Sequence, residues 1–394
     1  MKLIDDIVAD KPLLTEWRRD FHAHPEIAYQ EHRTSQLVSE RLSSFGIEVH
    51  TGLGGTGVVG RLKAGTGNRA IALRADMDAL PMAELNEFAH RAAVPDRMHA
   101  CGHDGHTTML LGAAKHLAAS PLFDGTVYFI FQPAEEGEAG AKAMIDDGLF
   151  DRFPVESVYG MHNWPGMPVG SFAVKPGPMM AAVDVFELAI VGEGCHAAMP
   201  HQGVDSIVTA AQVITGLQTI TSRNTDPVDA AVVSVTTVHG GDADNVIPER
   251  VVLGGTVRTF RDAVRDAVEP AMRRIAGGIC EAMGASYELD YTRLYPATVN
   301  SIEESEIAAA AAATVAGAAN VNHQPVPSMG GEDFAFMLRE RPGSYVWVGN
   351  GIGEGDGATG CMLHNPRYDF NDEILPIGAS YWVELVKQIL PEPD

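Results

Sequence analysis

The spacing of apolar residues divides the first part of the chain into alternating helices and strands. Apolar residues at helical spacing from Ile4 to Phe21 predict a first helix, and residues 31–45 predict a second. Short apolar runs predict four strands, at residues 57–63, 69–75, 126–131 and 157–161. A helix is predicted between the second and third of these strands, at residues 106–119. This order predicts an α/β fold with a mostly parallel sheet that is covered by helices on both faces.

The pattern changes after residue 182. The predicted elements are then a strand, a helix, two strands, a helix and a strand, at residues 184–191, 205–221, 230–239, 250–259, 260–283 and 287–291. This is the β-α-β-β-α-β order of the ferredoxin-like split unit, an α+β domain. Residues that could carry out chemistry lie both before and after this segment. We therefore predict an inserted lid or dimerisation domain at 184–295. Residues 1–183 and 296–394 then form a discontinuous metal-binding catalytic domain.

An alanine-rich run follows at residues 308–319. Alanine has the highest helix propensity, so the run predicts a helix, which we expect to lie on the surface.

Composition narrows the possible partners of the chain. Its 394 residues are 45% hydrophobic and 20% charged, which is normal for a globular protein with a substantial core. The formal net charge of −24 repels phosphate backbones, so we expect no nucleic-acid partner. No run of 18 apolar residues predicts a membrane span, and the start does not resemble a secretory signal. The four cysteines lack paired short spacing, so we expect a reducing, cytoplasmic location.

A dense group of potential metal ligands lies in residues 98–106, just before a predicted helix. It contains Cys101, His103, Asp104 and His106, and these side chains bind borderline divalent metals. The glycines between them allow the backbone to bring neighbouring ligands together. Taken alone, a Cys-Gly-His string is equally compatible with a buried thiol beside a surface histidine, so the rest of the chain has to decide.

Further candidate ligands follow other predicted strands or a glycine-rich stretch. Each is weak alone, because paired glutamates are common on solvated loops and lone histidines are usually structural. The carboxyl ends of strands in an open α/β sheet are, however, where ligands bind. Adjacent glutamates point apart, so one can bind a metal while the other transfers a proton. Together these residues predict a two-metal site: Asp76, Asp78, Glu135, Glu136, His162 and His364.

Six ordered motifs run through the chain. They are LRADMDALP at 73–81, MHACGHD at 98–104, QPAEE at 132–136, GEGCHAAMPH at 192–201, NVIP at 245–248 and GGEDF at 330–334. In this order they closely resemble the amidohydrolase branch of the aminoacylase–carboxypeptidase metallopeptidase superfamily, which contains hippurate hydrolases and N-acyl-amino-acid amidohydrolases. The resemblance covers essentially the whole chain. It implies a zinc-peptidase-like catalytic domain and a homodimer or higher homo-oligomer that forms through the inserted domain.

The resemblance also implies a set of metal ligands. Cys101 would bridge two divalent ions, in place of the bridging aspartate of the wider superfamily. His103 and His162 would complete one site, and Glu136 and His364 would complete the other. Asp76 stands where the wider superfamily has a metal-binding histidine, so its role is open.

Five more residues receive roles from the resemblance. Glu135 would be the general base, and Asp78 would help to orient the site. His196, in the inserted domain, matches a histidine that reaches the active site of the partner subunit in dimeric relatives. Asn245 and Arg258 match positions that contact the substrate in some relatives.

The implied reaction is metal-dependent hydrolysis of the amide bond of small N-acyl amino acids, with acetyl, benzoyl or similar acyl groups. The ligand set suits zinc, manganese, nickel or cobalt and does not choose among them. A dipeptidase or carboxypeptidase of the same superfamily is an alternative. Two others are a cysteine hydrolase, with Cys101 as nucleophile and His103 or His106 as base, and a non-catalytic homologue that binds metal or peptide.

Overall fold

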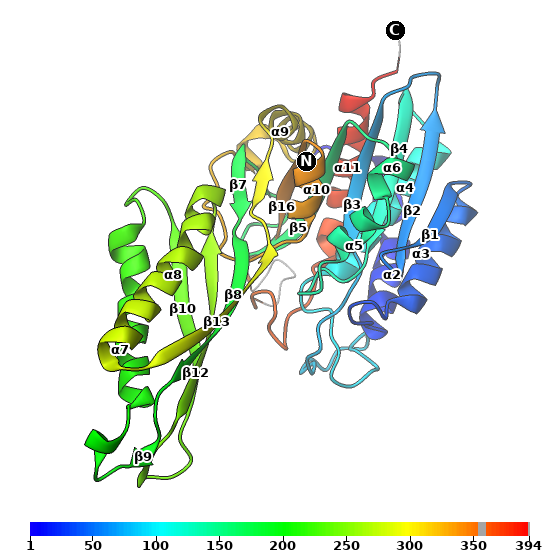
Figure 1. Ribbon diagram of the computed structural model, residues 1–394. Coiled ribbons are helices and arrows are strands. Elements are labelled where there is room, and N and C mark those ends of the chain that lie inside the picture. Colours follow the sequence, from blue (N-terminus) through cyan, green and yellow to red (C-terminus); the bar gives the residue numbers. More distant parts are fainter. Residues whose placement is uncertain (354–359, 393–394) are drawn as a thin grey trace. The chain divides into compact units, whose positions relative to one another are not determined.

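The computed structural model describes residues 1–353 and 360–392. The chain forms two compact units (Figure 1). The large unit contains Met1–Met179, Val299–Val326 and Asp333–Asp394, and the inserted unit contains Met180–Thr298 and Pro327–Glu332. The sequence predicted domain boundaries at residues 183–184 and 295–296. It did not predict that residues 327–332 also belong to the inserted unit. No helix among the described residues is long and apolar enough to cross a membrane.

An eight-stranded sheet organises the large unit, in the order β1-β2-β4-β3-β5-β16-β6-β15. The strands are β1 (Glu48–Leu53), β2 (Gly57–Ala64), β3 (Ala70–Asp76), β4 (Gly125–Gln132), β5 (Ser157–Pro165), β6 (Phe172–Ala173), β15 (Val321–Asn322) and β16 (Gly343–Gly351). The central strands β4, β3, β5 and β16 are parallel, whereas β1, β2 and the β16–β6 pair are antiparallel. The predicted α/β fold with a mostly parallel sheet is therefore confirmed.

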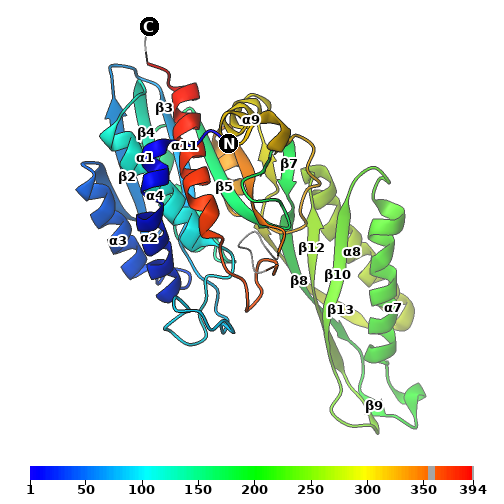
Figure 2. The ribbon, with the colours of Figure 1, turned by 180° about the vertical axis from the view of Figure 1, so that it is seen from behind.

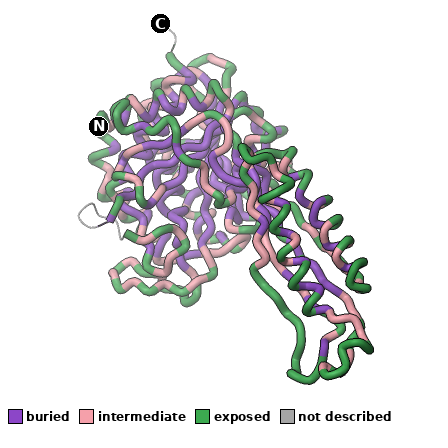
Figure 3. Tube along the Cα trace, turned by 90° about the vertical axis from the view of Figure 1, so that its left-hand side faces the viewer, coloured by how far each residue is buried: buried purple, intermediate pink, exposed green. Residues whose placement is uncertain are grey.

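Helices cover both faces of this sheet. Helices α2 (Lys11–Ala23), α4 (His103–Ala119) and α11 (Leu375–Ile389) lie on one face, and α5 (Gly140–Asp146), α6 (Leu149–Arg152) and α10 (Phe334–Glu340) lie on the other (Figures 1 and 2). Helix α3 (His32–Ser44) packs against β1, β2 and α4. Buried residues concentrate in the sheet and in the helices that cover it (Figure 3).

Two helix predictions need correction. The first helix is interrupted at Asp10, so that α1 (Asp5–Ala9) ends and α2 begins, with Pro12 in its first turn. Proline fits a helix start because it lacks the N–H group that would remain unpaired there. Most of the alanine run lies in α9 (Ile302–Ala316), and the expectation of a surface helix holds only for one face of this helix. Several alanines of α9 are buried because this helix packs against α11, where small side chains allow close approach.

The inserted unit has a four-stranded antiparallel sheet in the order β10-β12-β8-β13. Its strands are β8 (Ala182–Val191), β10 (Ala231–His239), β12 (Arg250–Thr259) and β13 (Ser286–Tyr295), and its long helices are α7 (Ser206–Thr219) and α8 (Asp262–Met283). Apolar residues of both helices and of the strands form a separate core. This arrangement confirms the predicted ferredoxin-like fold. The lid or dimerisation role of the unit stays a prediction.

Candidate metal centre

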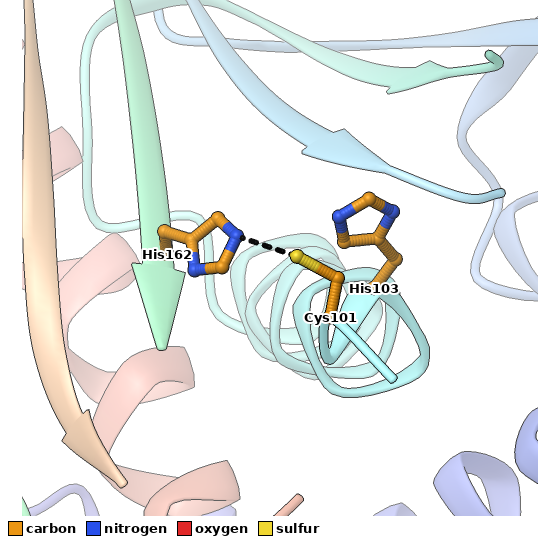
Figure 4. Close-up of side chains that lie close together, drawn as sticks. All are labelled: Cys101, His103 and His162. Carbon is orange, nitrogen blue, oxygen red and sulfur yellow. Dashed lines mark hydrogen bonds between the residues drawn. The ribbon is translucent and has the colours of Figure 1, made fainter. Parts of the chain in front are cut away.

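Three predicted ligands meet where the start of α4 approaches the end of β5. Cys101 and His103 lie at the amino end of α4, and His162 lies on β5, with its Nε2 3.4 Å from the Cys101 Sγ. The thiol points between the two imidazole rings (Figure 4). One potential ligand atom from each of the three residues lies within 4.8 Å of the others, and all three side chains are buried. Thiolate and imidazole donors at this spacing suit a divalent metal ion.

Gly102 makes this convergence possible. It has a φ of 94°, in the left-handed region that glycine adopts without strain. A Cβ atom at this position would lie 2.3 Å from the Asn163 Oδ1 and 2.7 Å from the Tyr368 hydroxyl oxygen. The residue between Cys101 and His103 is therefore restricted to glycine by both backbone geometry and space.

A second group of ligands shares the same thiol. Cys101, Glu136 and His364 again place one potential ligand atom each within 4.8 Å of one another. The His364 Nε2 lies 3.3 Å from the Glu136 Oε1, and the His364 backbone N–H donates to the Ala100 carbonyl oxygen at 2.8 Å. A thiol that belongs to both groups is in the position expected of a ligand that bridges two ions.

Asp78 holds His103 in the orientation that a ligand needs. The His103 Nδ1–H group donates to the Asp78 backbone carbonyl oxygen at 2.8 Å. The side-chain oxygen Asp78 Oδ1 lies 3.2 Å from the same nitrogen. The opposite nitrogen, His103 Nε2, is buried and has no hydrogen-bond partner among the described residues. A buried nitrogen without a partner is costly, so this atom fits a bound metal ion.

The electrostatic environment at His103 favours a cation. Burial lowers the pKa of His103, but the surrounding carboxylates of Asp76, Asp78 and Glu136 outweigh burial and raise it to about 10. For His162, burial and the neighbouring His106 keep the pKa well below its usual value, so that imidazole is neutral and can act as a ligand. The carboxylates supply the negative charge that divalent ions would neutralise.

The environment of Cys101 argues against a nucleophilic cysteine. Burial and the carboxylates of Glu136, Glu135 and Asp76 raise the pKa of Cys101 well above its usual value. A nucleophilic cysteine needs the opposite shift, toward the thiolate. A metal ion, by contrast, deprotonates a coordinating thiol directly. The surroundings of Cys101 thus favour a metal ligand.

Glu135 lies beside the ligands without belonging to the same two groups. It follows β4 directly, is 7% exposed, and accepts a hydrogen bond from the Asp333 backbone N–H at 3.4 Å. One of its carboxylate oxygens lies within 4.8 Å of potential ligand atoms of His103 and Glu136. It is therefore close enough to exchange a proton with a molecule held at the metal positions.

Comparison with known proteins agrees with this geometry. The model of the peptidase family M20/M25/M40 matches residues 72–388. The chain belongs to this family. It is 39% identical to the hippurate hydrolase of Campylobacter jejuni, over 99% of this chain and 100% of that protein. It is also 40% identical to the N-acetylcysteine deacetylase of Bacillus subtilis, over 97% of this chain and 99% of that protein.

A solved structure extends the comparison to the metal centre. A dinuclear metal-binding peptidase of the M20 family from Bacillus subtilis superposes with a TM-score of 0.84 and 37% sequence identity. The match covers 97% of this chain and 99% of that chain. The resemblance drawn from the sequence motifs is confirmed at the level of the M20 family, which is a family of hydrolases.

The sequence motifs did not reveal the network beneath the ligands. Arg74 is fully buried and donates to the carboxylates of Asp76 at 2.7 Å and Asp333 at 2.9 Å. Asp76 also lies 2.6 Å from the His106 Nδ1, and the His106 Nε2 lies 2.7 Å from the Asn163 Oδ1. The role of Asp76 was open in the sequence analysis. Its carboxylate is hydrogen-bonded to Arg74 and His106. The strings LRADMDALP and GGEDF contain Arg74, Asp76 and Asp333, but neither string indicates that these side chains are hydrogen-bonded to one another.

The remaining predicted residues lie in the inserted unit. His196 is on the short strand β9 (Cys195–His196), which pairs with β11 (Val246–Ile247), and the Ala197 N–H donates to the Asn245 carbonyl oxygen. His196 and Asn245 are exposed neighbours next to the start of β12. Arg258 is half-buried near the other end of β12, roughly 25 Å away at the usual rise per strand residue. One small substrate cannot contact both ends of this unit in a single chain.

Proposed function

We propose that this M20 protein is a two-metal amidohydrolase that cleaves the amide bond of N-acyl amino acids. The observation that carries the proposal is that Cys101 belongs to two ligand groups and that the buried carboxylate of Glu135 lies beside them. Two relatives with matching lengths are named as enzymes that act on acylated amino acids, hippurate and N-acetylcysteine. The acyl group and the metal remain part of the proposal.

The residues divide the chemistry between them. Divalent ions held by Cys101, His103, His162, Glu136 and His364 would lower the pKa of a water molecule and polarise the substrate carbonyl. Glu135 accepts the proton of that water as it attacks the acyl carbon. Glu135 then delivers the proton to the amide nitrogen, which leaves as the free amine. Asp78 keeps His103 directed at the metal position through the Nδ1 hydrogen bond.

Three residues of the inserted unit have proposed roles in binding the substrate and stabilising the transition state. His196 donates a hydrogen bond to the oxyanion that forms on the acyl carbonyl, and it reaches the site from the partner subunit of a homodimer. The Arg258 guanidinium is suited to the carboxylate of the amino-acid part, because arginine pairs with carboxylates through two parallel hydrogen bonds. Asn245 is a further substrate contact. The separation of His196 and Arg258 along β12 supports contributions from two different chains.

We expect His196→Ala to lower kcat by on the order of 100-fold, since one oxyanion donor is lost, and to leave the metal content unchanged. A mixing experiment separates the two subunits. His196→Ala and Glu135→Gln chains, each nearly inactive, are mixed under conditions of subunit exchange. Because half of the dimers are mixed and each holds one intact site, activity should rise to about a quarter of wild type. A mixture that stays inactive after subunit exchange would show that His196 acts within its own chain, and a His196→Ala protein that keeps wild-type kcat would show that His196 has no catalytic role.

The proposed function is tested with a panel of N-acetyl and N-benzoyl amino acids, dipeptides and C-terminal peptide substrates. We expect release of free amino acid from the acylated substrates, its loss after exhaustive chelation, and its recovery when zinc, manganese, nickel or cobalt is added. Turnover restricted to peptides would instead identify a dipeptidase or carboxypeptidase. Activity that survives complete metal removal would contradict the metal mechanism.

A further inference from the structure

Three buried carboxylates each accept a backbone N–H from the segment that comprises the loop with Glu135 and Glu136 and the first turn of α5. Ala134 donates to Glu31 at 2.9 Å, Glu136 donates to Asp78 at 2.9 Å, and Ala141 donates to Asp333 at 2.8 Å. Asp78 already has a role as the partner of His103, and Asp333 belongs to the Arg74 network. Glu31 has no role in the proposed mechanism, although its hydrogen bond is the one directly before the general base.

Glu31 is a costly residue to keep in this position. It lies just before α3, is 0% exposed, and uses both carboxylate oxygens. One oxygen accepts from the Ala134 N–H, and the other accepts from the Thr56 hydroxyl at 2.6 Å. No arginine or lysine is among these hydrogen-bond partners. A buried carboxylate without a cation is unfavourable, so its hydrogen bonds must contribute something that an apolar residue could not.

The backbone at Ala134 shows what Glu31 contributes. Ala134 has a φ of 53°, a left-handed conformation that costs a non-glycine residue about 1 kcal/mol. The loop also closes tightly, because a Cβ on Gly140 would lie 1.7 Å from the Pro133 carbonyl oxygen. The direction of the Glu135 side chain depends on this strained turn. The hydrogen bond from the Ala134 N–H to Glu31 stabilises the turn immediately before the base.

We propose that Glu31 is a positioning residue for the general base Glu135. Its carboxylate fixes the left-handed turn at Ala134, and the turn sets the direction in which the Glu135 carboxylate points. This inference rests on the proposed amidohydrolase function. The hydrogen bonds of the Glu31 carboxylate go to Thr56 and Ala134 and not to a proposed metal ligand, so its loss should reduce the rate of the chemical step without reducing metal binding.

The test compares three variants of the purified protein. Glu31→Ala removes both hydrogen bonds. Glu31→Gln keeps them, because the amide oxygen can accept from the Ala134 N–H and the amide nitrogen can donate to the Thr56 hydroxyl oxygen. Glu26→Ala is the matched control. Glu26 is a nearby carboxylate that accepts from the backbone N–H groups of Arg33 and Thr34 at 3.0 and 2.8 Å, and it has no hydrogen bond to the base-carrying loop.

We expect Glu31→Ala to lower kcat by about 10- to 100-fold with little change in KM, since small misplacements of catalytic groups have effects of this size. Glu31→Gln should restore kcat to within about threefold of wild type, because it restores both hydrogen bonds. Metal content by elemental analysis should equal that of wild type in all three variants. Glu26→Ala should lower the melting temperature while kcat stays near wild type.

Two outcomes would overturn the inference. In one, Glu31→Ala and Glu26→Ala show the same kcat at equal metal content, which would make Glu31 a stabilising residue only. In the other, the rate of Glu31→Ala falls in proportion to lost metal, which would place its effect on the ligands. Failure of the proposed function looks different, because the wild-type protein itself would then hydrolyse none of the panel substrates.

Discussion

Replacement of the general base, Glu135→Gln, should lower kcat by about 1000-fold, within the range for loss of an acid–base group. The amide cannot accept the proton of the attacking water, and it cannot return one to the leaving nitrogen. The proposed metal ligands do not include Glu135, so metal content should stay at the wild-type level. KM should change little, because the substrate is held by other groups.

The measurement is steady-state hydrolysis of the best panel substrate, with elemental analysis of the same samples. Glu138→Gln is the matched control, because Glu138 is an exposed carboxylate on the same loop. It should remain fully active, which would separate the role of Glu135 from the general charge of the loop. If Glu135→Gln retained activity, Glu135 could not be the base. If wild type were equally inactive with metal bound, the non-catalytic binding protein would be the better description.

Removal of the shared thiol, Cys101→Ala, should weaken binding at both metal positions at once. Cys101 belongs to both ligand groups, whereas His364 belongs to only one of them. Loss of a group that merely supports a ligand already costs 10- to 100-fold in metal affinity, so loss of the shared ligand should cost roughly 100-fold or more. Activity should fall with occupancy and should not recover at ordinary metal concentrations.

Metal titration with competing chelators measures this effect, and His364→Ala provides the comparison. We expect two weakened sites in Cys101→Ala and one strongly weakened site in His364→Ala. Cys280→Ala is the control for loss of a buried thiol, because Cys280 lies in the core of the inserted unit. It should keep both metal affinities. A Cys101→Ala protein that bound two ions as tightly as wild type would rule out the bridging role.

Several residues of the candidate site could be found from the sequence because they follow short apolar runs. Asp76, Asp78, Glu135 and His162 lie at or just after the carboxyl ends of β3, β4 and β5. Parallel strands bring these ends to one edge of the sheet, so residues far apart in the chain are expected to meet there. The ferredoxin-like insert could also be predicted from the sequence, because its alternating strands and amphipathic helices follow simple periodicities.

Features that depend on a partner far away in the chain could not be predicted from the sequence in this way. An alanine run has the same local pattern on the surface and in a core, and packing against α11 decides which face of α9 is buried. Glu31 precedes a helix of ordinary polar sequence, and nothing local indicates that its carboxylate reaches Ala134, more than 100 positions along the chain.

Residue type, order and periodicity were therefore enough to indicate the family, the fold class and the residues with metal-binding chemistry. The bridging position of Cys101 was implied by the family resemblance, and the folded chain brings its thiol close to both groups of ligands. The contacts of Asp76 with Arg74 and His106, and the contact of Glu31 with the turn before Glu135, appeared only in the folded chain. The physical reason is that hydrogen bonds and shared ligands depend on distances between side chains. Those distances are set by the packing of strands and helices that are remote in the chain.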